Sequence, residues 1–187
     1  MLDKIVKETT SAVVAAIQGV DDIITALRNV VKSQVVGILQ NIGDVGEATL
    51  DEVVAVGTGA IKGAHEIGTS ITEAAKSTVR SLVVGVSDVG GDVITASGKA
   101  ARGVISGAAD VGADLGKTAV AAVEGAISAA GAIGSDTAEA AKAAATGAIK
   151  AATEVGEEAG TAVKNALLSA ASLPRDVIDK VVKGSSK

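Results

Sequence analysis

An 11-residue repeat runs through this chain from end to end, and two such repeats form a 22-residue unit. The length of 187 residues equals seventeen repeats. The clearest marker of the unit is a Val-Gly or Ile-Gly dipeptide that recurs every 22 residues, at Val45-Gly46, Ile67-Gly68, Val89-Gly90, Val111-Gly112, Ile133-Gly134 and Val155-Gly156. A fixed period of this size is the signature of a repeat architecture. The sequence therefore predicts a repeating helical surface rather than an enzyme fold.

The repeat places apolar residues on one side of an α-helix. Eleven residues span three turns at about 3.67 residues per turn, so each repeat position lies at nearly the same angle around the helix axis in every repeat. The apolar or small positions are contiguous and cover about half of the circumference, which is typical of a helix that packs in a layer or lies on an apolar surface. The predicted apolar interaction face consists of Ile23, Val45, Val56, Ile61, Ile67, Val83, Val89, Ile105, Val111, Ile127, Ile133, Ile149 and Val155.

Charged residues occupy the opposite side of the helix. One repeat position is acidic in most units, at Asp22, Asp44, Glu66, Asp88, Asp110, Glu154 and Asp176, and another holds lysine at Lys7, Lys62, Lys117, Lys150 and Lys183. We expect this mixed-charge side to face solvent, with helix-surface ion pairs worth roughly 0.2 to 0.5 kcal/mol each.

Glycine forms a second pattern, in which small residues lie one helical turn apart. Such small-xxx-small pairs let a neighbouring helix backbone approach closely. The glycines predicted to make close helix packing are Gly59, Gly63, Gly85, Gly103, Gly107, Gly125 and Gly147. The alternative is that glycine keeps the free chain unfolded until it meets a partner, because each glycine inside a helix costs about 1 kcal/mol.

The phase of the repeat predicts an all-α fold made of one long helix or a few long segments, with right-handed or nearly straight coiled-coil packing. Loops would free the chain from its 11-residue phase, yet the apolar positions continue through every Val-Gly step. Bends are expected near residues 89–92 and 131–136, where glycines meet Ser or Asp. The alternative is eight short antiparallel helices, with the acidic residue as N-cap and the glycine closing the previous helix. Pro174 divides the helical region 1–173 from a short terminal helix and flexible tail, 174–187.

Composition narrows the classes of partner. The chain has no Phe, Tyr, Trp or Cys, and its apolar side consists of small aliphatic residues, so burial needs a second surface: another helix, another copy or lipid. A net charge of −5 with interspersed signs gives no basic patch for nucleic acid. No secretory signal or membrane-spanning helix is expected. The sequence does not identify the cellular compartment, and the default expectation is the cytoplasm or a peripheral membrane or granule surface.

Groups that could support catalysis are sparse in the sequence. His65 is the single histidine, and no cysteine could complete a metal site with it, so a surface role is expected. The segment Gly57 to Gly63 lacks the spacing of a phosphate-binding loop. We expect no enzyme activity, no catalytic, cofactor-binding or metal-binding residues, and no small-molecule substrate.

The columns of the repeat resemble those of the 11-residue amphipathic helical repeat proteins, among them synucleins, perilipins and exchangeable apolipoproteins. The resemblance is clearest from Val89 to Gly134, in Val89-Gly90-Gly91, Gly116-Lys117-Thr118-Ala119-Val120 and Val123-Glu124-Gly125-Ala126. It implies reversible binding of an α-helix to lipid surfaces, with no catalytic residues to carry over.

Two functions follow as expectations. The first is a self-associating, non-enzymatic protein that coats an apolar interface such as a lipid droplet, granule or membrane surface. The second is a structural protein that forms a bundle or filament by glycine-groove helix packing. An ice-binding or stress-protective helix is a minor third alternative. Both main hypotheses predict a homo-oligomer.

Overall fold

The computed structural model describes residues 1–17, 22–42 and 50–184, and in this part of the chain the regular elements are all helices, with no strand. The helices are α1 (Leu2–Ile17), α2 (Ile23–Ile42), α3 (Asp51–Glu66), α4 (Ile71–Asp88), α5 (Val93–Asp110), α6 (Leu115–Ile133), α7 (Thr137–Val155), α8 (Glu157–Ser169) and α9 (Arg175–Gly184). The predicted all-α class is confirmed.

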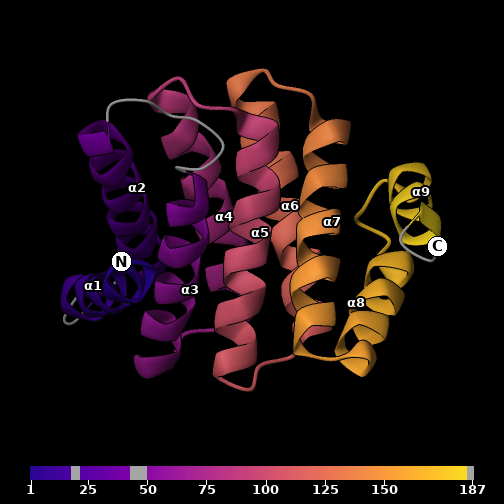
Figure 1. Ribbon diagram of the computed structural model, residues 1–187, viewed down its shortest axis with the longest axis horizontal. Coiled ribbons are helices and arrows are strands. Elements are labelled where there is room, and N and C mark those ends of the chain that lie inside the picture. Colours follow the sequence, from indigo (N-terminus) through magenta and orange to yellow (C-terminus); the bar gives the residue numbers. More distant parts are fainter. Residues whose placement is uncertain (18–21, 43–49, 185–187) are drawn as a thin grey trace.

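Consecutive helices pair as hairpins, and the hairpins stack in chain order along the longest axis (Figure 1). All of these helices except α8 make their most extensive contacts with a helix two positions away in the sequence, and α8 contacts α7 more extensively than α6. One layer is therefore α1–α3–α5–α7, and the other is α2–α4–α6–α8. Helix α9 packs against α7 and α8, so the two termini lie at opposite ends of the stack.

The prediction of long helices in coiled-coil packing is wrong, because each 22-residue unit is one helix and one turn. The turns contain Gly68, Gly90, Gly112 and Gly134, each at a φ between 70° and 76°, the left-handed region that favours glycine. At each turn the next residue donates its N–H to a carbonyl five residues earlier: Thr69 to Ala64, Gly91 to Val86, Ala113 to Ala108 and Ser135 to Ala130. This bond is the mark of a Schellman helix end.

The N-cap of the following helix lies two residues after the glycine and carries a capping side chain. Ser70, Asp92, Asp114 and Asp136 accept hydrogen bonds from the backbone N–H groups of the first turns of α4, α5, α6 and α7. Where the structure describes the acidic residue before the Val-Gly or Ile-Gly step, at Glu66, Asp88, Asp110 and Glu154, it lies within a helix and is not the N-cap that the short-helix alternative assigned to it. Asp88, for example, is the last residue of α4.

The two expected bends coincide with turns between helices. Residues 89–92 connect α4 to α5, and α6 continues to Ile133 before the turn to α7. Turns at 67–70 and 111–114 interrupt stretches that were expected to be continuous. Helix α9 begins directly after Pro174, and the expected flexible tail at 185–187 lies outside the described residues.

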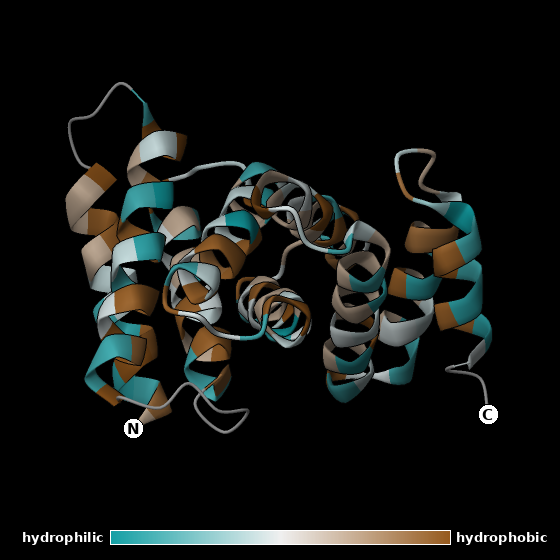
Figure 2. Cartoon of the chain, turned by 90° about the horizontal axis from the view of Figure 1, so that it is seen from above, coloured by the Kyte–Doolittle hydropathy of each residue, from teal (hydrophilic) through white to brown (hydrophobic). Residues whose placement is uncertain are grey.

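The stack encloses one apolar core that runs through all its helices. Ala and Val supply most of it, and the largest fully buried side chains include Leu27, Leu82 and Ile105. Polar and apolar residues occupy different sides of each helix (Figure 2). The second surface that the composition requires is supplied by neighbouring helices of the same chain. Among the described helices, none is both long and apolar enough to cross a bilayer.

The N-cap Asp92 makes stability depend on pH. The Thr95 hydroxyl, opposed by burial and assisted by the N–H groups of Thr95 and Ile94, holds the pKa of Asp92 below its ordinary value. Because the pKa is lower in the folded chain, this stabilisation is present above about pH 4 and is lost as the pH falls through the folded pKa. We expect Asp92→Ala to reduce the free energy of unfolding by about 1 kcal/mol at neutral pH.

Urea denaturation at neutral and acidic pH tests this expectation. Asp92→Asn is the matched control, because an asparagine caps the helix without a titrating group. The variant should lose less stability than the wild type on acidification. An equal acid-dependent loss in both chains would contradict the assignment.

Candidate interaction surface

The glycines singled out for close packing all face a neighbouring helix. A Cβ placed on Gly59, Gly63, Gly85, Gly103, Gly107, Gly125 or Gly147 would lie closer than 3.0 Å to an atom of the helix two positions earlier. Real Cβ atoms are essentially never this close to other atoms. The small-xxx-small pairs are therefore the seams of each layer.

Two threonine hydroxyls bridge these seams. Thr58 Oγ1 donates to the carbonyl oxygen of Gly103 at 3.1 Å and lies 2.9 Å from that of Val54. Thr10 Oγ1 donates in the same way to the carbonyl of Gly59, at 3.1 Å. So short a side chain reaches the next helix only because glycine brings the two backbones together. Thr58 shares its column of the repeat with Thr25, Thr69 and Thr146, but the sequence pattern did not single out this column.

The predicted apolar interaction face lies mostly between helices. Fully buried members are Val56, Ile61, Val83, Ile105 and Ile149. Partly buried members are Ile23, Ile67, Val89, Val111, Ile127 and Ile133. Val155 is 56% exposed, and Val45 lies outside the described residues. The residues in the Val-Gly steps are less buried because they sit at helix ends, a position that a continuous helix would not give them.

The recurring acidic residue joins helices of one layer. Asp88 of α4 pairs with Lys32 of α2 at 2.7 Å, Asp110 of α5 with Lys62 of α3 at 2.7 Å, and Glu154 of α7 with Arg102 of α5 at 2.8 Å. These carboxylates are about half exposed, so each pair contributes about 0 to 1 kcal/mol. The acidic series thus marks contacts between repeats as well as a solvated face.

One small-residue pair has no covering helix. Asp22 accepts the N–H of Thr25 and caps α2. Gly37 lies fifteen residues after this cap, as Gly85 lies fifteen after Ser70 in α4. A Cβ on Gly85 would collide with Val35, whereas one on Gly37 would meet nothing within 4 Å. Together with the exposed Ser33 one turn earlier, Gly37 forms an unfilled groove, here called the α2 groove.

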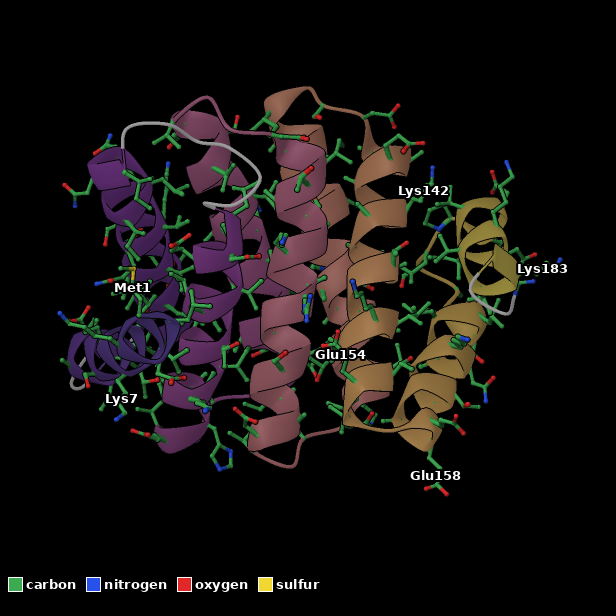
Figure 3. All side chains as sticks on the ribbon, viewed as in Figure 1. Met1, Lys7, Lys142, Glu154, Glu158 and Lys183 are labelled. Atoms are coloured by element: carbon green, nitrogen blue, oxygen red, sulfur yellow. The ribbon has the colours of Figure 1, made fainter. Side chains whose placement is uncertain are left out.

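Exposed large apolar side chains gather at the two ends of the stack. Among the described residues they are Met1, Leu2, Ile42, Val155 and Leu168. The first three belong to the α1–α2 hairpin and the last two to the α7–α8 hairpin, while α3 to α6 hold none. Figure 3 shows Met1 at one end of the stack and Glu158 at the other. Terminal repeats of such stacks ordinarily carry a polar outer face, so both ends depart from that rule.

The side chains that could bind a metal or act as acid or base lie apart from one another in the described residues. His65 is exposed in the last turn of α3. Within residues 1–17, 22–42 and 50–184, no three His, Asp or Glu side chains come together as a metal-ligand group. Comparisons of the chain with models of protein families, with curated proteins and with solved structures found no match.

The sequence pattern alone did not single out Ser33 and Gly37. The signal that would have found them is the distance from the N-cap. Once Asp22 is recognised as the cap of α2, the pair takes the same place as Gly103 and Gly107 after Asp92.

Proposed function

We propose that this chain is a non-enzymatic structural protein that associates end to end, with the C-terminal end of one copy seated in the α2 groove of the next. The observation that carries the proposal is the open groove itself. The small pairs of α4, α5, α6 and α7 are each covered by the helix two positions earlier, whereas α2 comes first in its layer.

A second copy suits this groove because the stack already shows what kind of surface fits it. Within the chain, the small-residue pair of each helix from α4 to α7 contacts the preceding helix of the same layer. It touches the side of that helix that faces the C-terminal end of the stack, as the pair of α4 contacts α2. Helix α8 is the last in that layer, and it bears Leu168, which is 37% exposed. Seating α8 of one copy on α2 of another continues the layer and covers apolar residues at both ends.

Such a contact joins two different surfaces, so it does not close on itself. Heterologous contacts of this kind generate open stacks unless a rotation closes them into a ring. The proposal therefore specifies a linear assembly of hairpin stacks in which the repeat continues from copy to copy.

Coating of a lipid or other apolar surface was the other expectation from the sequence. It would require Val56, Ile61, Val83 and their equivalents to leave the contacts in which they are fully buried. End-to-end association requires no such opening, and this difference favours it.

Sedimentation velocity over a dilution series tests the proposal. The wild-type mass should rise with concentration, and Gly37→Leu should keep the chain monomeric because leucine fills the groove. Gly131→Leu is the matched control: Gly131 is a helical glycine of α6 that is likewise uncovered, with only Thr137 within 4 Å of its added Cβ. A wild type that stays monomeric at every concentration would contradict the proposal. Helix-dependent binding to phosphatidylcholine vesicles would then favour the coating of a lipid surface.

A mixing experiment tests the head-to-tail geometry. Leu168→Glu blocks the C-terminal surface and leaves the α2 groove open, whereas Gly37→Leu does the reverse. Each variant alone should be monomeric, and their mixture should give dimers that grow no further. Symmetric pairing of two α2 grooves predicts a different outcome, in which Leu168→Glu still dimerises alone.

A further inference from the structure

A trough of about 420 Å³ runs along the seam between α5 and α7. Gly98, Ala143 and Gly147 lie where the two helices touch, and a Cβ on Gly98 would lie 3.2 Å from the carbonyl oxygen of Ala143. Because these residues have little or no side chain, nothing fills the space above the contact. Longer side chains from the adjoining turns form the walls.

Basic side chains and hydroxyls line this trough. Lys99 and Arg102 come from α5, and Lys142 and Lys150 come from α7. Hydroxyl groups are contributed by Thr95 and Thr146, and Glu139 is the single carboxylate in the lining.

Three of the four cations are held by acidic partners. Lys99 pairs with Asp51 of α3, and Lys142 lies 3.4 Å from Glu139. Arg102 Nη2 donates to both carboxylate oxygens of Glu154, at 2.8 and 3.0 Å.

Lys150 differs from the other three cations. It is exposed and forms no ion pair with any described residue. Its ammonium group is therefore the cation of the trough that is available to a ligand.

Positive charge also surrounds the trough. A neighbouring cavity of about 400 Å³ shares Thr146 and Lys150 with it and adds Lys164. Another of about 600 Å³, between α7 and α9, shares Glu139 and Lys142 with it and adds Asp176 and Lys180. The charged side chains that line the trough itself are Lys99, Arg102, Lys142, Lys150 and Glu139, and the acids Asp51 and Glu154 pair with Lys99 and Arg102. This region is net positive in a chain whose net charge is −5.

We propose that the trough between α5 and α7 binds a phosphate-bearing ligand, with the Lys150 ammonium as the donor to the phosphate oxygens, because the Thr146 hydroxyl already donates to the carbonyl oxygen of Lys142 at 2.8 Å. Its volume lies in the range of small-ligand sites, about 300 to 1,000 Å³. Lysine acts on phosphate as a compact point charge, so the free ammonium suits this task. The chain has no aromatic residue on which a base could stack, so recognition rests on the phosphate group. The site lies along the side of the stack and is independent of the α2 groove.

Calorimetric titration of the full chain with inorganic pyrophosphate is the first test. Binding should saturate, and Lys150→Gln should weaken it on the order of tenfold, since a hydrogen bond to a charged group is lost. Lys150→Arg should restore most of the affinity. Lys4→Gln, at an exposed lysine of α1 paired with Glu8, is the matched control and should leave the affinity unchanged.

Vesicles of phosphatidylcholine with phosphatidic acid distinguish a lipid headgroup from a free phosphate compound. Pyrophosphate binding that depends on Lys150, without vesicle binding, supports a free compound as the ligand. Vesicle co-sedimentation that depends on Lys150 supports a headgroup as the source of the phosphate. Absence of binding in both arms, or binding that Lys150→Gln leaves unaltered, would overturn the proposal.

Discussion

Replacing Gly147 with alanine is expected to lower the free energy of unfolding by about 2 to 3 kcal/mol. The same change inside an ordinary helix stabilises it by about 1 kcal/mol. At Gly147 the added Cβ would press on the carbonyl oxygen of Gly98 in α5, and on the backbone atoms beside it. A backbone carbonyl cannot rotate away as a side chain can, so α5 and α7 must separate. Overpacking then exceeds the gain in helix propensity.

Gly37→Ala is the matched control for this experiment, because both glycines lie inside helices and only their surroundings differ. Nothing lies within 4 Å of a Cβ on Gly37, so alanine there should stabilise the chain by about 0.5 to 1 kcal/mol. Urea denaturation at dilute protein concentration measures both variants while keeping association low. A stability change of the same sign in both would contradict the assignment of Gly147 to a packed seam.

The sequence predicted the helical class and the close-packing glycines because both depend on local pattern. Helical propensity and a three-turn period require an α-helix, whichever way the helix is folded back. A glycine pair one turn apart, such as Gly103 and Gly107, is costly in a helix unless a second backbone approaches. The structure places the backbone of α3 at that pair.

The break-up into hairpins was missed because a repeated turn preserves the phase just as a continuous helix does. When every unit contains a helix of similar length and a turn of similar length, the 22-residue period carries through each turn. The local chemistry gave the opposite indication, with Gly90 suited to a left-handed helix end and Asp92 suited to an N-cap. Giving that pair of signals more weight than the phase would have predicted the hairpins.

The open groove and the basic trough could not be predicted from the pattern. Both depend on which helix is adjacent to which, and the repeat is nearly the same in every unit. Gly37 differs from Gly85 only because no helix among the described residues precedes α2 in its layer. Lys150 likewise looks like any lysine of its column, with Glu154 one turn later in the same helix as an obvious partner. Only the packing of α5 on α7 brings Arg102 to Glu154 instead.

Substituting alanine at all four turn glycines should have the opposite effect in a hairpin stack and in a continuous helix. Gly68, Gly90, Gly112 and Gly134 each have open space around a prospective Cβ, so only backbone conformation is at issue. In a continuous helix the four alanines would add about 1 kcal/mol each. At a φ of 70° to 76°, each should instead cost about 1 kcal/mol or more, because a Cβ disfavours the left-handed region.

The four turns are separated by whole helices, so their costs should add to about 4 to 6 kcal/mol. That is a large part of the roughly 5 to 15 kcal/mol that stabilises an ordinary domain. The matching fourfold asparagine variant should lose less stability, since asparagine tolerates the left-handed region better than alanine. Thermal and urea unfolding followed by circular dichroism would give the order glycine, asparagine, alanine. An alanine variant with higher stability and undiminished helix content would mean that these glycines lie within helices, and that the 22-residue unit does not end in a turn.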